Sequence, residues 1–203
     1  MNFLFKGHLF WFDGIDRGGK SSTIEFLKEA LSVDNEVISV ESKMVAGIRV
    51  PTLLGNFPDE ISYMLFWQAI RMVELSTITP ALKAGQVVLS DRGPFSQWAY
   101  DLWGDLDKDF KKAQDDIYLK RCILPKTAYI FTIPYSAFVE RDDGKTILTE
   151  EKFNEIQDKY RKWGEQLKNI INTVFVDGTK PKDEVRNFVL EHINNVLKGE
   201  GHA

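Results

Sequence analysis

Eight residues near the start of the chain have the types and spacing needed to bind phosphate. Residues 14–21 read Gly-Ile-Asp-Arg-Gly-Gly-Lys-Ser and match the pattern G-x-x-x-x-G-K-[ST] in full. In such a loop the backbone N–H groups face anionic oxygens, and the N-terminus of the following helix favours negative charge. Lys20 can then reach the β- and γ-phosphates, and the Ser21 hydroxyl can ligate Mg²⁺. The sequence therefore predicts that the chain binds a nucleoside triphosphate.

A carboxylate and a guanidinium form a second candidate group. The apolar run 86–90 is followed directly by Asp91 and Arg92. Ligands bind at the carboxyl ends of parallel strands, so both side chains are expected beside the glycine loop. Asp91 can hold Mg²⁺, directly or through water, and Arg92 can clamp a phosphate with two N–H groups. The alternative is an ion pair that only caps a turn.

Aromatic and polar side chains on two expected helices can contact a base and a sugar. Trp67 and Arg71 are four residues apart and share a helix face, where a ring can stack on a base and a guanidinium can bind its edge. The alternative for Trp67 is core packing, but an arginine on an apolar helix needs a polar partner. Further polar groups follow on a short helix: Ser96, Gln97 and Tyr100.

Alternating strand-like and helical runs must position these residues. Strands are expected near 8–13, 36–41, 86–90, 127–133 and 173–176, and helices near 19–31, 60–78, 95–102, 108–120, 149–171 and 182–197. Thr79-Pro80 has the pattern of an N-cap followed by proline, which predicts a new short helical turn that ends at Gly85. The alternation indicates an α/β fold with an open, five-stranded parallel sheet flanked by helices. The polar stretch 140–149 is either a solvated loop or part of a lid over the phosphates.

Length and charge limit the function classes. The 203 residues suit one domain, residues 1–203, and the net charge of −4 argues against a protein that coats nucleic acid. Cys122 is the single cysteine, so no internal disulfide or cysteine-based metal cluster is expected. No apolar run approaches the roughly 20 residues that span a bilayer, and no signal peptide is recognised. A cytoplasmic protein without a membrane or nucleic-acid partner is expected.

Several blocks together resemble the thymidylate kinases, a family of P-loop nucleoside monophosphate kinases. Residues 12–23 are similar to the P-loop of that family, and residues 65–71 to its Leu-Phe-x-Ala-x-Arg helix. Residues 78–92 resemble its next block, and residues 96–100 its Ser-x-x-Ala-Tyr element. The resemblance implies a three-layer P-loop NTPase fold with a short lid at about 135–149. It also implies a homodimer, and transfer of the γ-phosphate of ATP to the 5′-phosphate of dTMP, which gives dTDP and ADP.

The resemblance also implies roles for individual residues. ATP would be bound by Gly14, Ile15, Asp16, Arg17, Gly18, Gly19, Lys20, Ser21, Ser22 and Arg141, and Mg²⁺ by Ser21 and Asp91. The acceptor would be bound by Asp16, Arg49, Trp67, Arg71, Arg92, Ser96, Gln97 and Tyr100. Trp67 and Arg71 would contact the thymine, and Gln97 would lie at the base edge. Asp16 would bind the 3′-hydroxyl, Tyr100 would lie under the deoxyribose, and Arg92 would hold the phosphate. Catalysis would rest on Lys20, Arg17, Arg92 and Asp91. Arg17 lies where one branch of the family carries its catalytic arginine, and Arg141 and Lys145 in the lid can share that role.

Three departures from the family pattern affect the acceptor side. Trp67 stands where the family has Phe, and Gly93 stands where it has an aromatic residue. Residues 41–49 lack the family's Arg-Glu-Pro-Gly-Gly block, so either Arg49 or Lys43 is the expected extra contact to the acceptor phosphate. A kinase for another or modified deoxynucleoside monophosphate is therefore an alternative.

Two further function classes remain open at this point. One is a kinase whose acceptor is a deoxynucleoside or a base in DNA, although the acidic charge disfavours DNA. The other is a P-loop protein that acts as a switch rather than a kinase, but the chain contains no Asn-Lys-x-Asp, which a GTPase needs to recognise guanine.

Overall fold

A five-stranded parallel sheet forms the centre of the molecule. The computed structural model describes residues 5–41, 44–45, 48–49, 75–100, 123–142, 144 and 147–199. The strand order in the sheet is β2-β5-β1-β6-β7. The strands are β1 (His8–Gly14), β2 (Val37–Glu41), β5 (Val87–Asp91), β6 (Thr127–Thr132) and β7 (Asn172–Asp177). Every pairing between them is parallel, as predicted.

Alternate side chains of β1 contribute to two separate hydrophobic cores. Leu9 and Trp11 belong to one core, whereas Phe10 and Phe12 belong to the other. Both sets are almost completely buried. A strand with both faces covered needs apolar residues at every position, and this explains the continuous apolar run in the sequence.

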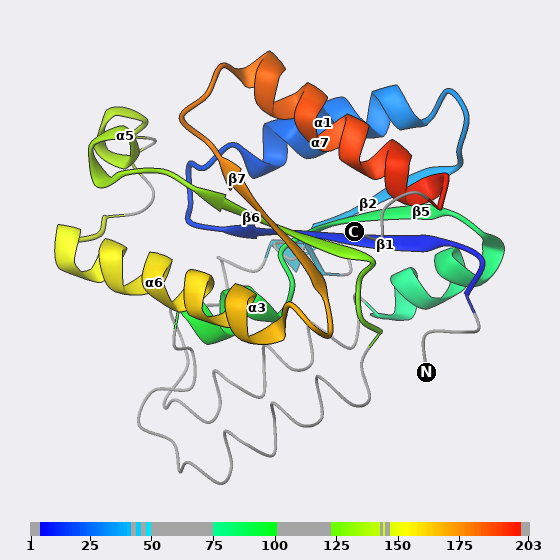
Figure 1. Cartoon of the computed structure of the whole chain (residues 1–203), viewed down its shortest axis with the longest axis horizontal. Helices are drawn as coiled ribbons and strands as arrows, with labels where there is room; N and C mark the ends of the chain where they lie inside the picture. Colours follow the sequence, from blue (N-terminus) through cyan, green and yellow to red (C-terminus); the bar gives the residue numbers. More distant parts are fainter. Residues whose placement is uncertain are drawn as a thin grey trace, which may run out of the picture.

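Helices cover both faces of the sheet, which gives three layers (Figure 1). On one face lie α1 (Lys20–Leu31) and α7 (Lys182–Leu197), and the opposite face carries α3 (Pro94–Ala99) and α6 (Glu150–Leu167). The short helix α5 (Tyr135–Glu140) follows β6 and lies within the predicted lid. Thr149 caps α6, because its side chain accepts a hydrogen bond of 3.3 Å from the N–H of Lys152. The predicted fold class is confirmed.

One local prediction was wrong. No new helix begins at Thr79-Pro80, because residues 75–84 are helical throughout. Ile78, Ala81 and Leu82 are all buried, and this continuous apolar stripe extends across the proposed break. Gly85 does end this helix, with a φ of +91°.

The structure adds two short strands between residues 44 and 49, where the sequence analysis placed no element. Strands β3 (Met44–Val45) and β4 (Ile48–Arg49) form a small antiparallel sheet. Each contains only two residues, too few to give a periodic pattern. The predicted helix at 108–120 and most of the predicted helix at 60–78 lie outside the described residues. None of the described helices is both long and apolar enough to cross a membrane.

Candidate active site

The glycine loop connects β1 to α1 at the carboxyl edge of the sheet. Its backbone takes left-handed conformations at Gly14, Arg17 and Gly19, with φ of +117°, +64° and +98°. A Cβ atom at Gly14 would collide with the backbone of Phe131 on β6, so the close approach of these two strands requires glycine there. The start of the loop is therefore held close to β6.

Lys20 starts α1 and is only 5% exposed. Its Nζ donates hydrogen bonds to the carbonyl oxygens of Gly14 (2.9 Å) and Ile15 (2.7 Å). Burial lowers the pKa of Lys20 to about 8, because desolvation disfavours the charged form. The ammonium is thus held inside the loop, where negatively charged phosphate oxygens would stabilise its positive charge.

Ser21 and Asp91 bring two oxygen ligands together. The Ser21 hydroxyl donates to Oδ2 of Asp91 at 3.2 Å, which joins the start of α1 to the end of β5. Oδ1 of Asp91 is buried and has no hydrogen-bond partner among the described residues. Hydroxyl and carboxylate oxygens are ligands that Mg²⁺ prefers, so this pair fits the ion. The described residues contain no group of three His, Cys, Asp or Glu side chains that could hold a metal ion without a substrate.

Arg92, which follows β5, is held by groups from three other parts of the chain. Its Nη2 forms an ion pair with Oδ1 of Asp16, and its Nη1 donates to the Ser96 hydroxyl at 3.1 Å. Nη1 also lies 3.5 Å from the hydroxyl of Tyr160. The hydroxyl of Tyr100 donates to the other oxygen of Asp16 at 3.3 Å. This arrangement places a guanidinium, a carboxylate and an aromatic ring at one end of the glycine loop.

The pKa of the Tyr100 hydroxyl is consistent with its role as a hydrogen-bond donor. Burial is the largest influence and raises the pKa of Tyr100 to about 12, so its hydroxyl keeps its proton near neutral pH. The same physical cause raises the pKa of Tyr160. Burial also raises the pKa of Asp13, which is fully buried at the end of β1, while a hydrogen bond from Ser96 opposes this increase.

Two arginines connect the other end of the loop to the predicted lid. Nη1 of Arg17 donates to the carbonyl of Phe138 (2.9 Å), and Nη2 to Asp142 (2.7 Å). The guanidinium also lies over the Phe138 ring, 4.2 Å from its centroid. Arg141 reaches in the opposite direction and donates to the carbonyls of Arg17 (3.1 Å) and Gly178 (2.8 Å). The structure therefore brings Arg17 and Arg141 together.

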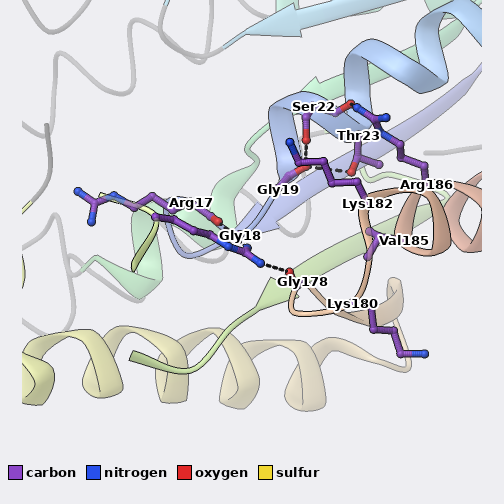
Figure 2. Close-up of a pocket in the computed structure, with 11 residues that line it drawn as sticks. Arg17, Gly18, Gly19, Ser22, Thr23, Gly178, Lys180, Lys182, Val185 and Arg186 are labelled. Carbon is purple, nitrogen blue, oxygen red and sulfur yellow. Dashed lines mark hydrogen bonds between the residues drawn. The ribbon is translucent and has the colours of Figure 1, made fainter. Parts of the chain in front are cut away.

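An open pocket of about 250 Å³ lies beside this end of the loop (Figure 2). Its lining includes residues of the loop and α1, Gly178 after β7, and the start of α7. The sequence interpretation missed three cationic residues that line it: Lys180, Lys182 and Arg186. They follow the last strand, where the rule that ligands bind at carboxyl ends of strands could have identified them.

Several predicted residues cannot be placed by side chain. Trp67 and Arg71, together with Lys43 and Lys145, lie outside the described residues. Gln97 belongs to α3 and Arg49 to β4, but only their backbone is described. The thymine-contacting part of the prediction therefore remains a prediction.

The fold and the loop together define a P-loop nucleotide-binding protein with a second group of charged residues at one end of the phosphate loop. Comparison with known proteins specifies the class further. A family model described as thymidylate kinase matches residues 12–189, and the chain belongs to this family. The predicted recognition is confirmed, and so is the predicted class of enzyme, an ATP-using kinase.

Curated relatives share this description at low identity. A probable thymidylate kinase of Methanococcoides burtonii is 26% identical over 204 residues, which cover 95% of this chain and 99% of that protein. A thymidylate kinase of Thermoanaerobacter sp. (strain X514) is 27% identical over 203 residues, which cover 95% and 100% of the two chains. A thymidylate kinase of Paracidovorax citrulli is 36% identical over 100 residues, or 47% of this chain and 45% of that one.

Proposed function

We propose that this protein transfers the γ-phosphate of ATP to the 5′-phosphate of dTMP. The observation that carries the proposal is that two groups able to bind phosphate lie at the same edge of the sheet. The glycine loop with Lys20 ends β1, and Arg92 follows β5, the strand paired with β1. Phosphoryl transfer needs alignment of two phosphates and positive charge more than covalent chemistry. Lys20 and Arg92, held at neighbouring strand ends, would supply both requirements.

On the donor side, the loop amides and Lys20 would hold the β- and γ-phosphates. The pocket beside Arg17 and Arg141 would receive the nucleoside part of ATP. Ser21 and Asp91 would hold Mg²⁺, whose charge would offset the negative charge that develops on the transferring group. Arg17 would add a second positive charge to that group in the manner of an arginine finger. To do so it must exchange at least part of its contact with Asp142 for phosphate oxygens.

On the acceptor side, Arg92 would hold the 5′-phosphate of dTMP. Asp16 would accept a hydrogen bond from the 3′-hydroxyl, and the Tyr100 ring would lie under the sugar. The Tyr100 hydroxyl and Asp16 are already in contact, which supports their acting as one surface toward deoxyribose. A 2′-hydroxyl would have to be accommodated against the Tyr100 ring, so ribonucleotides are expected to bind poorly.

Assembly and location are also proposals. A homodimer is proposed because the family resemblance implies it, and light scattering of the purified protein would measure the mass directly. A cytoplasmic location is proposed from the lone Cys122, which suits a reducing compartment. Localisation of a tagged chain by microscopy or fractionation would test it.

A coupled assay of ADP release tests the reaction. The protein would receive ATP, Mg²⁺ and, separately, dTMP, dUMP, dCMP, dGMP, dAMP or thymidine. Strong turnover with dTMP and dTDP as product is the expected result. Lys20→Ala is the matched control and should abolish turnover while circular dichroism shows an unchanged fold. Turnover of a different monophosphate, or none, would overturn dTMP as the substrate, and near-normal turnover by Lys20→Ala would overturn the role of the loop.

A further inference from the structure

Four residues from four parts of the chain form a buried polar cluster beneath the acceptor site. They are Asp13 at the end of β1, Arg92 after β5, Ser96 in α3 and Tyr160 in α6, here called the Asp13 cluster. Asp13, Ser96 and Tyr160 are 0%, 7% and 1% exposed. Arg92 extends from this cluster to Asp16 in the glycine loop.

The directions of the hydrogen bonds in this cluster follow from the number of protons available. The Ser96 hydroxyl donates its single proton to Oδ1 of Asp13 at 2.6 Å. Toward Tyr160, 2.9 Å away, Ser96 can then only accept, so the tyrosine hydroxyl is the donor. Burial keeps that tyrosine protonated, as a donor must be. The hydrogen bonds therefore run from Tyr160 to Ser96, and from Ser96 to the carboxylate of Asp13.

This order leaves oxygen lone pairs facing Arg92. Ser96 retains one lone pair for Nη1 of Arg92 at 3.1 Å, and Tyr160 offers another at 3.5 Å. The opposite nitrogen, Nη2, is held by Asp16. An arginine side chain loses rotamer entropy when it is held in one geometry, and contact on two sides fixes the plane of its guanidinium in advance. Bidentate recognition of phosphate depends on that plane.

The contact with Asp16 is the one that substrate is expected to weaken. In the proposed function Asp16 receives the 3′-hydroxyl of the acceptor, so it then shares its oxygens between sugar and Arg92. The hydroxyls of Ser96 and Tyr160 are buried under Arg92 and keep their contact with it. They would therefore hold the guanidinium when the acceptor is in place.

Helix α6 also links this cluster to the predicted lid. Phe153, two turns before Tyr160 on α6, packs against Phe138 and Tyr135 of α5 with ring centroids 5.1 and 5.4 Å apart. The same helix face thus contacts α5 at one point and Arg92 at another. A shift of α6 against α5 would move the Tyr160 hydroxyl relative to the guanidinium.

We propose that Tyr160 is a positioning residue, which acts through Ser96 and Asp13 to orient the Arg92 guanidinium for the acceptor phosphate. This inference rests on the proposed role of Arg92 in binding that phosphate. Tyr160 itself touches no substrate in this arrangement. Its effect should therefore depend on the presence of Arg92, and it should concern the acceptor rather than ATP.

Tyr160→Phe tests the role because it removes one oxygen and leaves the packed ring. We expect kcat with dTMP to fall about tenfold and the KM for dTMP to rise a few-fold, with the KM for ATP unchanged. Tyr129→Phe is the matched control. Tyr129 is equally buried, and its hydroxyl pairs with Nδ1 of His192 at 2.8 Å within the other core. This control should leave all three constants near those of the unmodified protein.

A double-mutant cycle with Arg92→Lys separates positioning from general stability. If Tyr160 acts through the guanidinium, Tyr160→Phe should cost less than twofold in the Arg92→Lys background. A full tenfold loss in both backgrounds, or no difference from Tyr129→Phe, would overturn the proposal. Ser96→Ala provides a second route to the same cycle if Tyr160→Phe folds poorly. Turnover by the unmodified protein tests the proposed function separately, and if another monophosphate is the acceptor, the cycle is run with that one.

Discussion

The indole ring of Trp11 occupies the space that a side chain at Gly93 would need. A Cβ atom at position 93 would lie 2.6 Å from Cδ2 of Trp11 and 2.9 Å from Cγ and Cε3. The indole also packs edge-on against Phe95, with centroids 6.0 Å apart. The family resemblance predicts an aromatic residue after Asp91-Arg92, and here β1 supplies an aromatic ring in contact with that position. In this chain the space beside position 93 is therefore filled by a ring from β1.

Gly93→Ala should be destabilising for this reason. The added methyl group must displace Trp11, and overpacking of this kind typically costs roughly 1–3 kcal/mol. Urea denaturation of the two proteins measures the loss. Combining Gly93→Ala with Trp11→Phe, which reduces the ring, should recover part of it. A Gly93→Ala protein as stable as the original would show that the backbone moves aside at no cost.

Arg17→Ala should reduce kcat much more than it changes the KM for either substrate. Arginine fingers contribute about 10³–10⁵-fold, and a reduction toward the lower end is expected because Lys20 and Arg92 remain. Asp142→Ala is the control, since Asp142 holds the same guanidinium but is 66% exposed. Exposed ion pairs are worth about 0–1 kcal/mol, so this change should alter kcat only a few-fold. Equal losses in the two variants would mean that Arg17 matters only as a contact to the lid.

Tyr100→Ala should narrow the preference for deoxyribose over ribose. Without the ring, a 2′-hydroxyl meets no obstacle, and Asp16 loses the hydrogen bond from the tyrosine. The ratio of kcat/KM for dUMP to that for UMP measures the change. Tyr100→Phe keeps the ring and should retain the ratio, so that the two variants separate steric exclusion from hydrogen bonding. A ratio unaffected by Tyr100→Ala would place the sugar elsewhere.

The stability of the fold should decrease as pH falls below about 6.5. Burial lowers the pKa of His192 in the folded protein, whereas the unfolded chain binds a proton at the usual value of 6.5. Between these two pKa values the unfolded state carries more protons, so the free energy of unfolding rises with pH and is reduced by acid. His8 acts in the same direction, through burial and the nearby charge of Lys126.

His192→Gln isolates this contribution because glutamine can still bond to the hydroxyl of Tyr129. Thermal melting between pH 5 and pH 7.5 should show a smaller change in Tm for this variant than for the original protein. Carboxylates with lowered pKa values, such as Asp177, contribute equally to both proteins and cancel in the comparison. Identical pH profiles would remove His192 from the explanation.

The fold was largely predictable because its signals are local. Buried parallel strands need apolar residues at every position, and β1 and β6 show this directly in the sequence. The break proposed at Thr79-Pro80 failed because cap chemistry was weighed without the buried stripe that continues through Ile78 and Leu82. The local sequence allows either a helix break or a continuous helix, and tertiary packing favours the continuous helix.

The site was predictable where a motif specifies it, and less so where distant residues meet. The glycine loop, Asp91 and Arg92 follow from spacing and strand position alone. Tyr160 could not be assigned to Arg92, because the two are separated by 68 residues and meet only when α6 packs on α3. Lys180, Lys182 and Arg186 belong to no motif, so only their position after the last strand indicates that they line the pocket.

Asp16 and Arg17 are adjacent in the chain but face different halves of the site. Asp16 pairs with Arg92, whereas Arg17, whose own backbone is left-handed, reaches Phe138 and Asp142. For protein engineering this means that the loop is not an interchangeable cassette. A phosphate loop grafted from another ATPase would bring its own residue at position 16 and leave Arg92 without its counter-ion. If the protein is redesigned for a new acceptor, the loop and the end of β5 therefore have to be changed together.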